Sequence, residues 1–335
     1  MRMLSYADAI REAHAQLLAS DARVFVVGQG LWSPWYVGSS MRDLDTEFGR
    51  HRIIDSPVSE SAITGTAIGA AIAGMRPIVV HPRMDFMLLA TDAVVNQAAN
   101  WSYMFAGQAG APVVIRAIVN RGGEQGAQHS QALHAIFAHI PGLKVVMPAT
   151  PYDAKGLLIS AVYDGNPVVY IDDRWLYDQT ADVPEEQYQV PIGKGAVRTH
   201  GEDITIVGIS YAAAKAVEAA VTLHEKGIDA EVIDLRSIKP WDSELVISSI
   251  KRTGRLLVTD IGWRSGGIAA EIIATAAESA LDAMIAPPAR VTLPDVPAPT
   301  SKSLETSYYF GADEIAAAAE QLVVHGRTHL SEVAQ

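Results

Sequence analysis

Short apolar runs rich in β-branched residues recur through the first half of the chain, separated by stretches with helical periodicity. Parallel strands need a crossover helix between them and are covered on both faces, so each reads as an unbroken apolar run. The pattern therefore predicts an α/β fold built on a mainly parallel sheet. The expected strands begin at Val24, Arg76, Pro112, Leu143 and Pro167, and the expected helices include 91–105 and 151–163.

The periodic pattern breaks off at residues 177–191, where acidic residues and prolines take over. We expect a first domain at 1–178, a linker at 179–191 and a second, smaller α/β domain at 192–335. Two domains suit a chain of 335 residues, because single hydrophobic cores stop growing below about 300 residues. In the second domain, strands are expected from Asp203, Asp229, Gly254 and Pro288, and helices at 212–226, from Gly267 and at 312–324.

Composition disfavours several classes of function. The formal net charge of −12 argues against nucleic acid, because such a partner requires a cationic surface. Without cysteine, the chain has no disulfides, thiolate nucleophiles or sulfur ligands for metals, which suits a reducing cytoplasm. The most apolar run, 62–73, is shorter than the roughly 20 residues that cross a bilayer, and the charged N-terminal stretch does not resemble a signal peptide. We therefore expect a cytoplasmic protein that binds neither membranes nor nucleic acids.

Residues 55–74, DSPVSESAITGTAIGAAIAG, place one carboxylate, Glu60, at the start of a helix of small residues. Ser59 is a candidate N-cap and the helix dipole favours an acid in the first turn, so a structural role alone explains Glu60. Gly65, Gly69 and Ala73 recur every fourth residue and leave one helix face almost bare. We expect a neighbouring helix, from this chain or from another copy, to pack closely on that face.

A second candidate site is the glycine-rich loop RGGEQGAQHSQ, residues 121–131, which follows an expected strand. The carboxyl ends of parallel strands are where ligands bind, and such a loop wraps closely around one. His129 lies in this loop among polar neighbours, although a lone histidine is more often structural. Two further histidines follow at intervals of five, at 134 and 139, and this spacing matches no helical metal pair.

Motifs of several common enzyme families are absent from the sequence. No GxGxxG or GxSxG motif follows a strand, and no GxxxxGK[ST] motif occurs. Hydride transfer from an intrinsic Rossmann site, serine hydrolysis and nucleotide hydrolysis are therefore disfavoured. Phe86 lies at a loop-to-helix junction, where an aromatic side chain is usually part of the core unless its ring faces an open site.

Several stretches, taken in order along the chain, carry a family resemblance. The stretches are RIIDSPVSE (52–60), AIGAAIAGMRPIV (67–79), QHSQ (128–131), IPGLKVVMP (140–148), DAKGLL (153–158), NPVVYID (166–172), EVIDLRSIKPWD (231–242) and DVPAP (295–299). Together they resemble the beta subunits of the thiamine-diphosphate-dependent component of 2-oxo-acid dehydrogenases, such as pyruvate and branched-chain dehydrogenases, in the transketolase-like superfamily. An ordered set of this kind is far more specific than any single member.

The resemblance implies a transketolase-like pyrimidine-binding domain followed by a transketolase C-terminal domain. It implies that Glu60 hydrogen-bonds a ring nitrogen of the aminopyrimidine of thiamine diphosphate and takes part in the proton relay that activates the thiazolium carbon. Phe86 falls where the family places an aromatic ring against the pyrimidine. His129 falls where the family places a histidine that assists substrate binding and acyl transfer. Asp164 and Asn166 coincide with a loop that binds a monovalent cation, expected here to be potassium, in some members.

One motif of thiamine-diphosphate enzymes is missing. Such enzymes hold magnesium and the diphosphate with a Gly-Asp-Gly motif and a distant Asn, and the chain has no Gly-Asp-Gly. The resemblance implies that a separate alpha subunit supplies this half of the site, usually in an α2β2 assembly. The expected reaction of the two subunits is decarboxylation of a 2-oxo acid, with acyl transfer to the lipoyl domain of an acyltransferase component.

Two departures from the family pattern keep other functions open. Near the cofactor the family commonly has Gly-Glu-(Glu/Asp), whereas this chain has Gly-Gln-Gly, which puts Gln29 beside the cofactor. The loop at 121–125, usually small and apolar, includes Arg121 and predicts a more polar substrate channel. One alternative is a two-component thiamine-diphosphate carboligase or transketolase-like enzyme that transfers an acyl or ketol unit to a carbonyl acceptor. The other alternative is a non-catalytic scaffold subunit that retains the fold.

Overall fold

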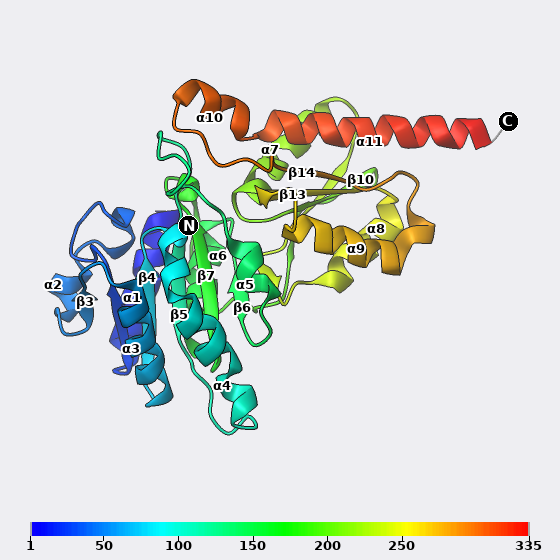
Figure 1. Ribbon diagram of the computed structural model, residues 1–335. Coiled ribbons are helices and arrows are strands. Elements are labelled where there is room, and N and C mark those ends of the chain that lie inside the picture. Colours follow the sequence, from blue (N-terminus) through cyan, green and yellow to red (C-terminus); the bar gives the residue numbers. More distant parts are fainter. Residues whose placement is uncertain (1, 334–335) are drawn as a thin grey trace. The chain divides into compact units, whose positions relative to one another are not determined.

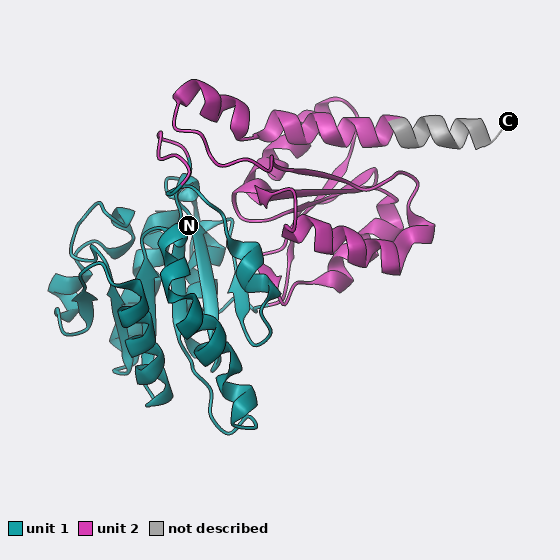
Figure 2. Ribbon diagram, viewed as in Figure 1, with its two compact units in different colours: residues 1–121, 128–192 teal, residues 122–127, 193–335 magenta. Residues whose placement is uncertain are grey.

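The computed structural model describes residues 2–333, and the side chains of residues 2–324. The chain divides into two compact units (Figure 1 and Figure 2). Unit 1 comprises residues 1–121 and 128–192, and unit 2 comprises residues 122–127 and 193–335. The short loop 122–127 thus belongs to unit 2, although both segments that flank it belong to unit 1.

A parallel sheet forms the centre of unit 1. Within this unit its strands follow the order β6-β7-β5-β4-β2-β3. They are β2 (Val24–Gly28), β3 (Ile53–Asp55), β4 (Arg76–His81), β5 (Val114–Val119), β6 (Lys144–Val146) and β7 (Val168–Asp173). Every residue of β5 and β7 is buried, as expected for central parallel strands covered on both faces. The predicted α/β fold with a mainly parallel sheet is confirmed.

Helices cover the two faces of this sheet (Figure 1). On one face, α1 (Tyr6–Ser20) packs against α6 (Pro151–Tyr163), whose bounds are those predicted. On the other face, α3 (Glu60–Ile72) packs against a helical stretch that spans residues 84–104. That stretch consists of 3-10 helix η2 (Met84–Ala90), π-helix η3 (Ala93–Ala98) and α4 (Ala99–Met104). The remaining short helices of unit 1 are η1 (Gly38–Met41), α2 (Leu44–Phe48), α5 (His134–His139) and η4 (Arg174–Leu176).

The expectations about α3 require two corrections. Ser59 is the N-cap residue, but its side chain accepts no capping hydrogen bond, and its hydroxyl donates to the Pro57 carbonyl oxygen at 3.2 Å. The face that carries Gly65 and Gly69 is open, since a Cβ atom added at either glycine would have no atom within 4 Å. No helix among the described residues covers this face, so a helix from another chain remains a prediction.

The segment 179–191, expected as a linker, packs within unit 1. Its strand β8 (Thr180–Asp182) pairs antiparallel with β1 (Met3–Ser5). The fully buried ammonium of Lys155 then donates to three consecutive carbonyl oxygens at 184–186, at 2.7, 3.2 and 2.9 Å. Flexible linkers lack such buried contacts, so the structure shows this segment as a fixed part of unit 1. Composition alone does not reveal these contacts because they join positions far apart in the sequence.

The centre of unit 1 contains a buried ion pair. Arg116 of β5 donates to both carboxylate oxygens of Asp172 of β7, at 3.0 and 2.8 Å, and both side chains are fully buried. Tyr177 donates to the same carboxylate at 2.5 Å, and Ser40 accepts from Arg116 at 2.8 Å. Burial is the largest single influence and lowers the arginine pKa, but Asp172, Tyr177 and Tyr170 together raise it above its ordinary value. Burial, and then Asp172, raise the pKa of the Tyr177 phenol.

Unit 2 is built on a second sheet with the order β14-β13-β10-β11-β9. Its strands are β9 (Ala196–Thr199), β10 (Ile204–Gly208), β11 (Ala230–Asp234), β13 (Leu256–Trp263) and β14 (Ala289–Leu293). The edge strand β9 is antiparallel to β11, and the other pairings are parallel. Unit 2 also contains the short elements β12 (Ser237–Lys239), η5 (Leu281–Ala283) and α10 (Lys302–Tyr308).

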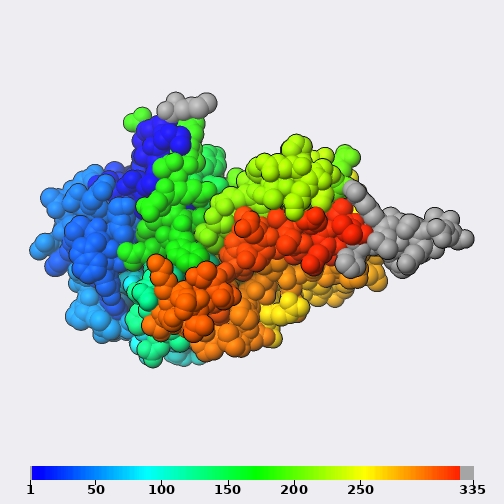
Figure 3. Space-filling view, turned by 90° about the horizontal axis from the view of Figure 1, so that it is seen from above, coloured from blue at the N-terminus to red at the C-terminus, as the bar shows by residue number. Residues whose placement is uncertain are grey.

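Two pairs of helices pack on the sheet of unit 2. α7 (Tyr211–Glu225) and α11 (Ala312–Val333) lie side by side, as Figure 3 shows for the yellow-green and red segments. α8 (Ser243–Thr253) and α9 (Ile268–Ala280) form the other pair. Over the described residues, no helix is both long enough and apolar enough to cross a membrane.

Candidate active site

The strand order of unit 1 has a topological switch point between β2 and β4. From β2 the chain runs to β3 on one side, and it then returns to β4 on the other side of β2. At such a switch point the connections leave in opposite directions, and α/β proteins bind ligands beyond the carboxyl ends of the strands there. Three side chains come from this edge: Gln29 just after β2, Glu60 at the start of α3 and His81 at the end of β4.

Glu60 and Gln29 form a buried pair. Only 4% of Glu60 and 7% of Gln29 is exposed, and Gln29 Nε2 donates to Glu60 Oε1 at 3.0 Å. The other carboxylate oxygen, Oε2, accepts no hydrogen bond from any residue that the structure describes. Oε2 is not among the fully buried oxygens that lack a partner, so this atom is accessible to solvent and to a ligand. The pair therefore fits a bound group that donates a hydrogen bond to Oε2, such as a protonated ring nitrogen.

A second polar pair lies one helical turn from Glu60. Thr64 and His81 are fully buried, and Thr64 Oγ1 lies 3.2 Å from His81 Nε2. Burial lowers the pKa of His81 to about 4, although the charge of Glu60 acts in the opposite direction. The imidazole is therefore neutral at pH 7. The sequence analysis missed both residues; the i,i+4 spacing from Glu60 to Thr64 and a histidine closing an apolar strand were the available signals.

The structure brings Phe86 and His129 together. Phe86 lies in η2 and His129 lies after β5, and their ring centroids are 5.1 Å apart with the planes at 87°. Both side chains are partly exposed. This edge-to-face contact is the arrangement that aromatic rings prefer, and it leaves part of each ring accessible to a ligand. The two residues that the resemblance assigns to cofactor and substrate thus form one pair.

Asp85 supports this pair through the segment that carries His129. Asp85 Oδ1 accepts from the backbone nitrogen of Gln131 at 3.1 Å and from its side-chain Nε2 at 2.8 Å. Burial raises the pKa of Asp85, and the hydrogen bonds from Gln131 oppose that rise. The hydroxyl of Ser61, next to Glu60, donates to the Leu89 carbonyl oxygen, so η2 is also tied to the start of α3. The sequence analysis missed Asp85, whose only signal was its position beside Phe86.

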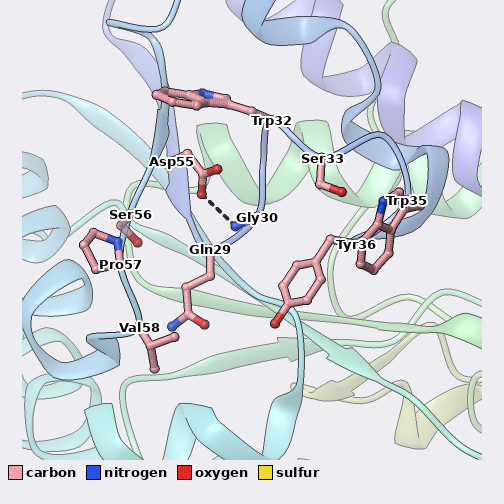
Figure 4. Close-up of a pocket in the computed structure, with 10 residues that line it drawn as sticks. All are labelled: Gln29, Gly30, Trp32, Ser33, Trp35, Tyr36, Asp55, Ser56, Pro57 and Val58. Atoms are coloured by element: carbon pink, nitrogen blue, oxygen red, sulfur yellow. Dashed lines mark hydrogen bonds between the residues drawn. The ribbon is translucent and has the colours of Figure 1, made fainter.

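A pocket of about 490 Å³ opens next to Gln29 (Figure 4). It is built from the loop that follows β2 and from the turn between β3 and α3. Its lining residues are Gln29, Gly30, Trp32, Ser33, Trp35, Tyr36, Asp55, Ser56, Pro57 and Val58. Three of these ten are aromatic, and Trp35 is 70% exposed. The sequence analysis did not predict this pocket.

Arg121 does not supply the free charge expected for a polar substrate channel. Its guanidinium is buried, donates twice to Asp173 Oδ2, at 3.1 and 2.6 Å, and lies 4.4 Å from the ring centroid of Trp175. The carboxylate neutralises the arginine inside unit 1. The expectation for this side chain is therefore wrong, because an acidic residue 52 positions away in the sequence meets it in the fold.

Asp164 and Asn166 lie between α6 and β7. Asp164 Oδ2 accepts from the ammonium of Lys144 at 2.5 Å, and its Oδ1 is buried without a hydrogen-bond partner in the part of the chain that is described. Asp164 Oδ1 is thus free to accept a ligand. The other oxygen, Oδ2, is already paired with the ammonium of Lys144. Among the described residues, no three His, Asp or Glu side chains converge in a group that could hold a metal ion.

Comparison with known families covers almost the whole chain. Residues 2–179 match the transketolase pyrimidine binding domain, and residues 193–315 match the transketolase C-terminal domain. Among solved structures, a split-gene transketolase described as an inactive beta4 tetramer has a TM-score of 0.78 at 22% identity. The match covers 96% of this chain and 98% of that one. This likeness shows the fold.

Curated relatives are similar over nearly the full length of this chain. The beta subunit of an acetoin:2,6-dichlorophenolindophenol oxidoreductase from Cupriavidus necator is 42% identical, over 97% of this chain and 99% of the relative. The beta subunit of 2-oxoisovalerate dehydrogenase from Bacillus subtilis is 38% identical, over 96% of this chain and 99% of the relative. The beta subunit of the pyruvate dehydrogenase E1 component from Rhizobium meliloti is 39% identical, over 91% of this chain and 66% of the relative. The chain therefore belongs to the thiamine-diphosphate-dependent, transketolase-like family that includes the beta subunits of 2-oxo-acid dehydrogenases.

Proposed function

We propose that this chain is the beta subunit of a thiamine-diphosphate-dependent 2-oxo-acid dehydrogenase, active only with an alpha partner. The observation that carries the proposal is the buried Gln29–Glu60 pair, whose free Oε2 lies at the switch point of a transketolase-like sheet. The contact between Phe86 of η2 and His129 of the loop after β5 supports it. Beta-subunit relatives at about 40% identity over the full chain support it further.

Each of these side chains has a distinct role in the proposal. When bound, thiamine diphosphate supplies the electron sink that decarboxylation of a 2-oxo acid requires. Glu60 binds a ring nitrogen of its aminopyrimidine through Oε2 and holds the proton there, while Gln29 fixes Oε1. Phe86 offers a ring surface to the aminopyrimidine. His129, oriented by its contact with Phe86, binds the substrate and assists acyl transfer.

The other half of the site belongs to the proposed alpha subunit. We assign magnesium and the diphosphate to a Gly-Asp-Gly motif on that partner, in an α2β2 assembly, because this chain has no such motif. A lipoyl domain of an acyltransferase component is the proposed acyl acceptor. We assign potassium to the turn of Asp164 and Asn166, where Asp164 Oδ1 is free. A cytoplasmic location is supported by the absence of cysteine.

The test is Glu60→Gln in the complex co-expressed with its alpha subunit. Gln lacks the carboxylate and cannot hold the proton, so decarboxylation should fall by about 100-fold or more. Thiamine-diphosphate binding, measured by calorimetry, should weaken far less, because the diphosphate contacts lie on the partner. Undiminished turnover would remove Glu60 from the mechanism. A complex that neither binds thiamine diphosphate nor needs this chain for turnover would be a scaffold assembly.

A second candidate function keeps the cofactor and changes the acceptor. The amide of Gln29, where the family commonly has a carboxylate, favours a carboligase or transketolase-like enzyme that passes an acyl or ketol unit to a carbonyl compound. The complex should be offered aldehydes together with oxidised lipoyl domain, whose disulfide takes up the two electrons as the acyl thioester forms, with products identified by mass spectrometry. Acylated lipoyl domain supports the dehydrogenase, and a new carbon–carbon bond in the product supports the carboligase.

A further inference from the structure

Arg83 carries a positive charge that no described residue neutralises. Its Nη1 donates to the carbonyl oxygen of Pro82 at 2.8 Å, and its Nε is buried without a hydrogen-bond partner among the described residues. In the part of the chain that the structure describes, Nη2 donates to no residue and no carboxylate pairs with this guanidinium. Because Nη2 is not among the fully buried nitrogens that lack a partner, it is accessible to a ligand. Arg83 is thus a half-buried cation with a free donor.

A second arginine lies close to Arg83. Burial lowers the pKa of Arg83, and the charge of Arg174 lowers it further, so the two guanidinium groups are near each other. Arg174 directly follows β7, is partly exposed and donates to the carbonyl oxygens of Tyr36 and Trp35, at 3.3 and 3.1 Å. These acceptors are neutral, and over the described residues Arg174 forms no ion pair either. Both positive charges therefore lack a carboxylate from this stretch of the chain.

Two unpaired like charges at a partly buried position fit an anionic ligand. Each guanidinium makes the other more costly to keep ionised, yet arginine stays charged at neutral pH. Asp85 does not compensate, because it raises the pKa of Arg83 less than burial and Arg174 lower it, and its Oδ1 is occupied by Gln131. A bound anion relieves the repulsion, and the planar donor set of a guanidinium matches the oxygens of a carboxylate or phosphate.

The hydroxyl of Tyr36 is a third donor near the two arginines. After burial and Arg174, the Tyr36 phenol is the next influence on the pKa of Arg83, so it also lies near this guanidinium. Its hydroxyl makes no hydrogen bond with any residue that the structure describes and is not fully buried. Figure 4 shows the hydroxyl directed inward from the loop after β2, while the backbone of Tyr36 is held by Arg174.

Arg83 is joined to the residues assigned to the substrate. It is the N-cap residue of η2, and the backbone nitrogen of Phe86 donates to its carbonyl oxygen at 3.2 Å. Phe86 in turn contacts His129. Arg83 and Arg174 follow β4 and β7, whose carboxyl ends lie at one edge of the parallel sheet of unit 1. Ligands bind at this edge in α/β proteins.

We propose that Arg83 and Arg174, with the Tyr36 hydroxyl, form a subsite for an oxyanion that a reactant carries at the end away from its reacting carbonyl group. The inference rests on the proposed function and names its substrate class. His129 keeps the reacting end and Glu60 keeps the aminopyrimidine, so the oxyanion contacts neither. A 2-oxo diacid supplies the oxyanion as its second carboxylate, and a phosphorylated acceptor supplies it as phosphate. Both present the same oxygens to a guanidinium.

The first test compares matched reactants in the assembled complex. 2-Oxoglutarate and 2-oxopentanoate have equal chain lengths and differ in the second carboxylate. Glyceraldehyde 3-phosphate and glyceraldehyde, offered as acceptors with pyruvate as donor, differ in the phosphate. The anionic member of one pair should have the higher kcat/KM by about 10-fold or more, because charged hydrogen bonds are strong. A preference in the first pair identifies the donor's carboxylate as the oxyanion, and a preference in the second pair identifies the acceptor's phosphate.

Variants of Arg83 connect that preference to the subsite. Arg83→Gln should lower the ratio of the two kcat/KM values by about 10-fold. Arg83→Lys should keep part of the ratio, because the charge remains while the planar donor set is lost. Arg23→Gln is the matched control, since Arg23 precedes β2 at the opposite end of the sheet, is 54% exposed and pairs with Asp21. It should leave the ratio unchanged.

Four results would overturn the assignment. One is a wild-type complex without a preference for the anionic member of either pair. Another is a preference that survives in Arg83→Gln. The third is an equal loss for both members of a pair in Arg83→Gln, which would mark a structural role of this side chain. The fourth is loss of the alpha subunit from Arg83→Gln in sedimentation velocity, which would mark Arg83 as an interface residue.

A binding measurement separates this inference from the proposed function. Calorimetry on the complex without thiamine diphosphate should show binding of 2-oxoglutarate or of glyceraldehyde 3-phosphate, weakened by about 10-fold in Arg83→Gln. If binding depends on Arg83 in this way but the complex decarboxylates no 2-oxo acid, the subsite stands and the dehydrogenase proposal fails. If the complex decarboxylates a 2-oxo acid and neither anion binds through Arg83, the subsite fails and the dehydrogenase proposal stands.

Discussion

Gln29 holds the Glu60 carboxylate at 3.0 Å with a neutral donor, the side-chain amide. The amide of Gln29 donates a hydrogen bond but does not give up its proton. Glu60 is therefore the only acidic group of the pair. The neighbouring Thr64–His81 pair is also uncharged, because burial keeps His81 neutral. At the scale of single residues, therefore, the site presents one carboxylate surrounded by neutral polar groups.

The consequence of this neutral donor is testable in Gln29→Glu. Two facing carboxylates cannot both ionise at this distance, so one proton is shared between them. The acid limb of decarboxylation activity should therefore move to higher pH by about one unit or more in this variant. Gln29→Met is the control, since it removes the donor and adds no charge. A pH profile for Gln29→Glu that coincides with that of the wild type would contradict the assigned role of the pair.

The Arg116–Asp172 pair makes a prediction about stability. Arg116→Met leaves the Asp172 carboxylate buried without its cation, which should lower the free energy of unfolding by about 3–5 kcal/mol. Adding Asp172→Leu to the same chain should recover part of the loss, because the unpaired charge disappears. Urea denaturation followed by circular dichroism measures both. A single variant as stable as the wild type would show that the carboxylate finds another partner or takes up a proton.

At the scale of elements, the site depends on how α3 and the helical stretch 84–104 pack on the sheet. The stretch changes from 3-10 to π to α geometry over its length, and its first part, η2, presents Phe86 to His129. π-helical turns are rare and occur often at functional sites. Asp85 fixes the 129–131 segment to η2, and Ser61 fixes η2 to the start of α3. These hydrogen bonds give the proposed site its internal geometry.

Removing the hydrogen bonds from Gln131 to Asp85 should impair His129 without unfolding the chain. Asp85→Ala loses both hydrogen bonds to Gln131, so kcat/KM should fall by about 10-fold while thermal unfolding shifts only slightly. Asp85→Asn retains an acceptor oxygen in the same place and should keep most of the activity. If Asp85→Asn loses as much activity as Asp85→Ala, the charge of Asp85 matters and its hydrogen bonds with Gln131 do not.

At the scale of the whole molecule, buried histidines link folding to pH. His14 of α1 and His81 of β4 are fully buried, and burial lowers their pKa values to about 3 and about 4. In the unfolded chain both return to the ordinary value near 6.5. Below that pH the unfolded state binds protons that the folded state does not. Stability is therefore complete above pH 6.5 and declines as the pH falls toward 4.

Urea denaturation between about pH 7.5 and pH 4.5 should show this decline. His81 alone contributes a loss of up to roughly 3 kcal/mol, since its pKa falls from 6.5 to about 4. His81→Gln keeps a hydrogen-bonding side chain next to Thr64 and no longer titrates, so its curve should be flatter than that of the wild type. Parallel curves for the two proteins would show that His81 is protonated in the folded state.

Much of the architecture could be read from the sequence because it depends on local patterns. Unbroken apolar runs predict the strands near Val24, Arg76 and Pro167, and helical periodicity predicts the first and last residues of α6 correctly. Composition carries no information about Lys155, which binds the carbonyl oxygens at 184–186 across the fold and so fixes the segment expected as a linker. The motif order and the missing Gly-Asp-Gly also predict a two-subunit enzyme.

The sequence by itself determined the α/β class, the positions of most strands and helices, and the family to which the chain belongs. Only the tertiary structure decided which side chains meet. Gln29 and Glu60 lie 31 positions apart and Arg121 and Asp173 lie 52 positions apart, yet each pair is in hydrogen-bonding contact. The physical reason is that periodicity records which face of an element is buried, whereas strand order sets which elements become neighbours. Strand order is a property of the complete sheet, and no local stretch of sequence contains it.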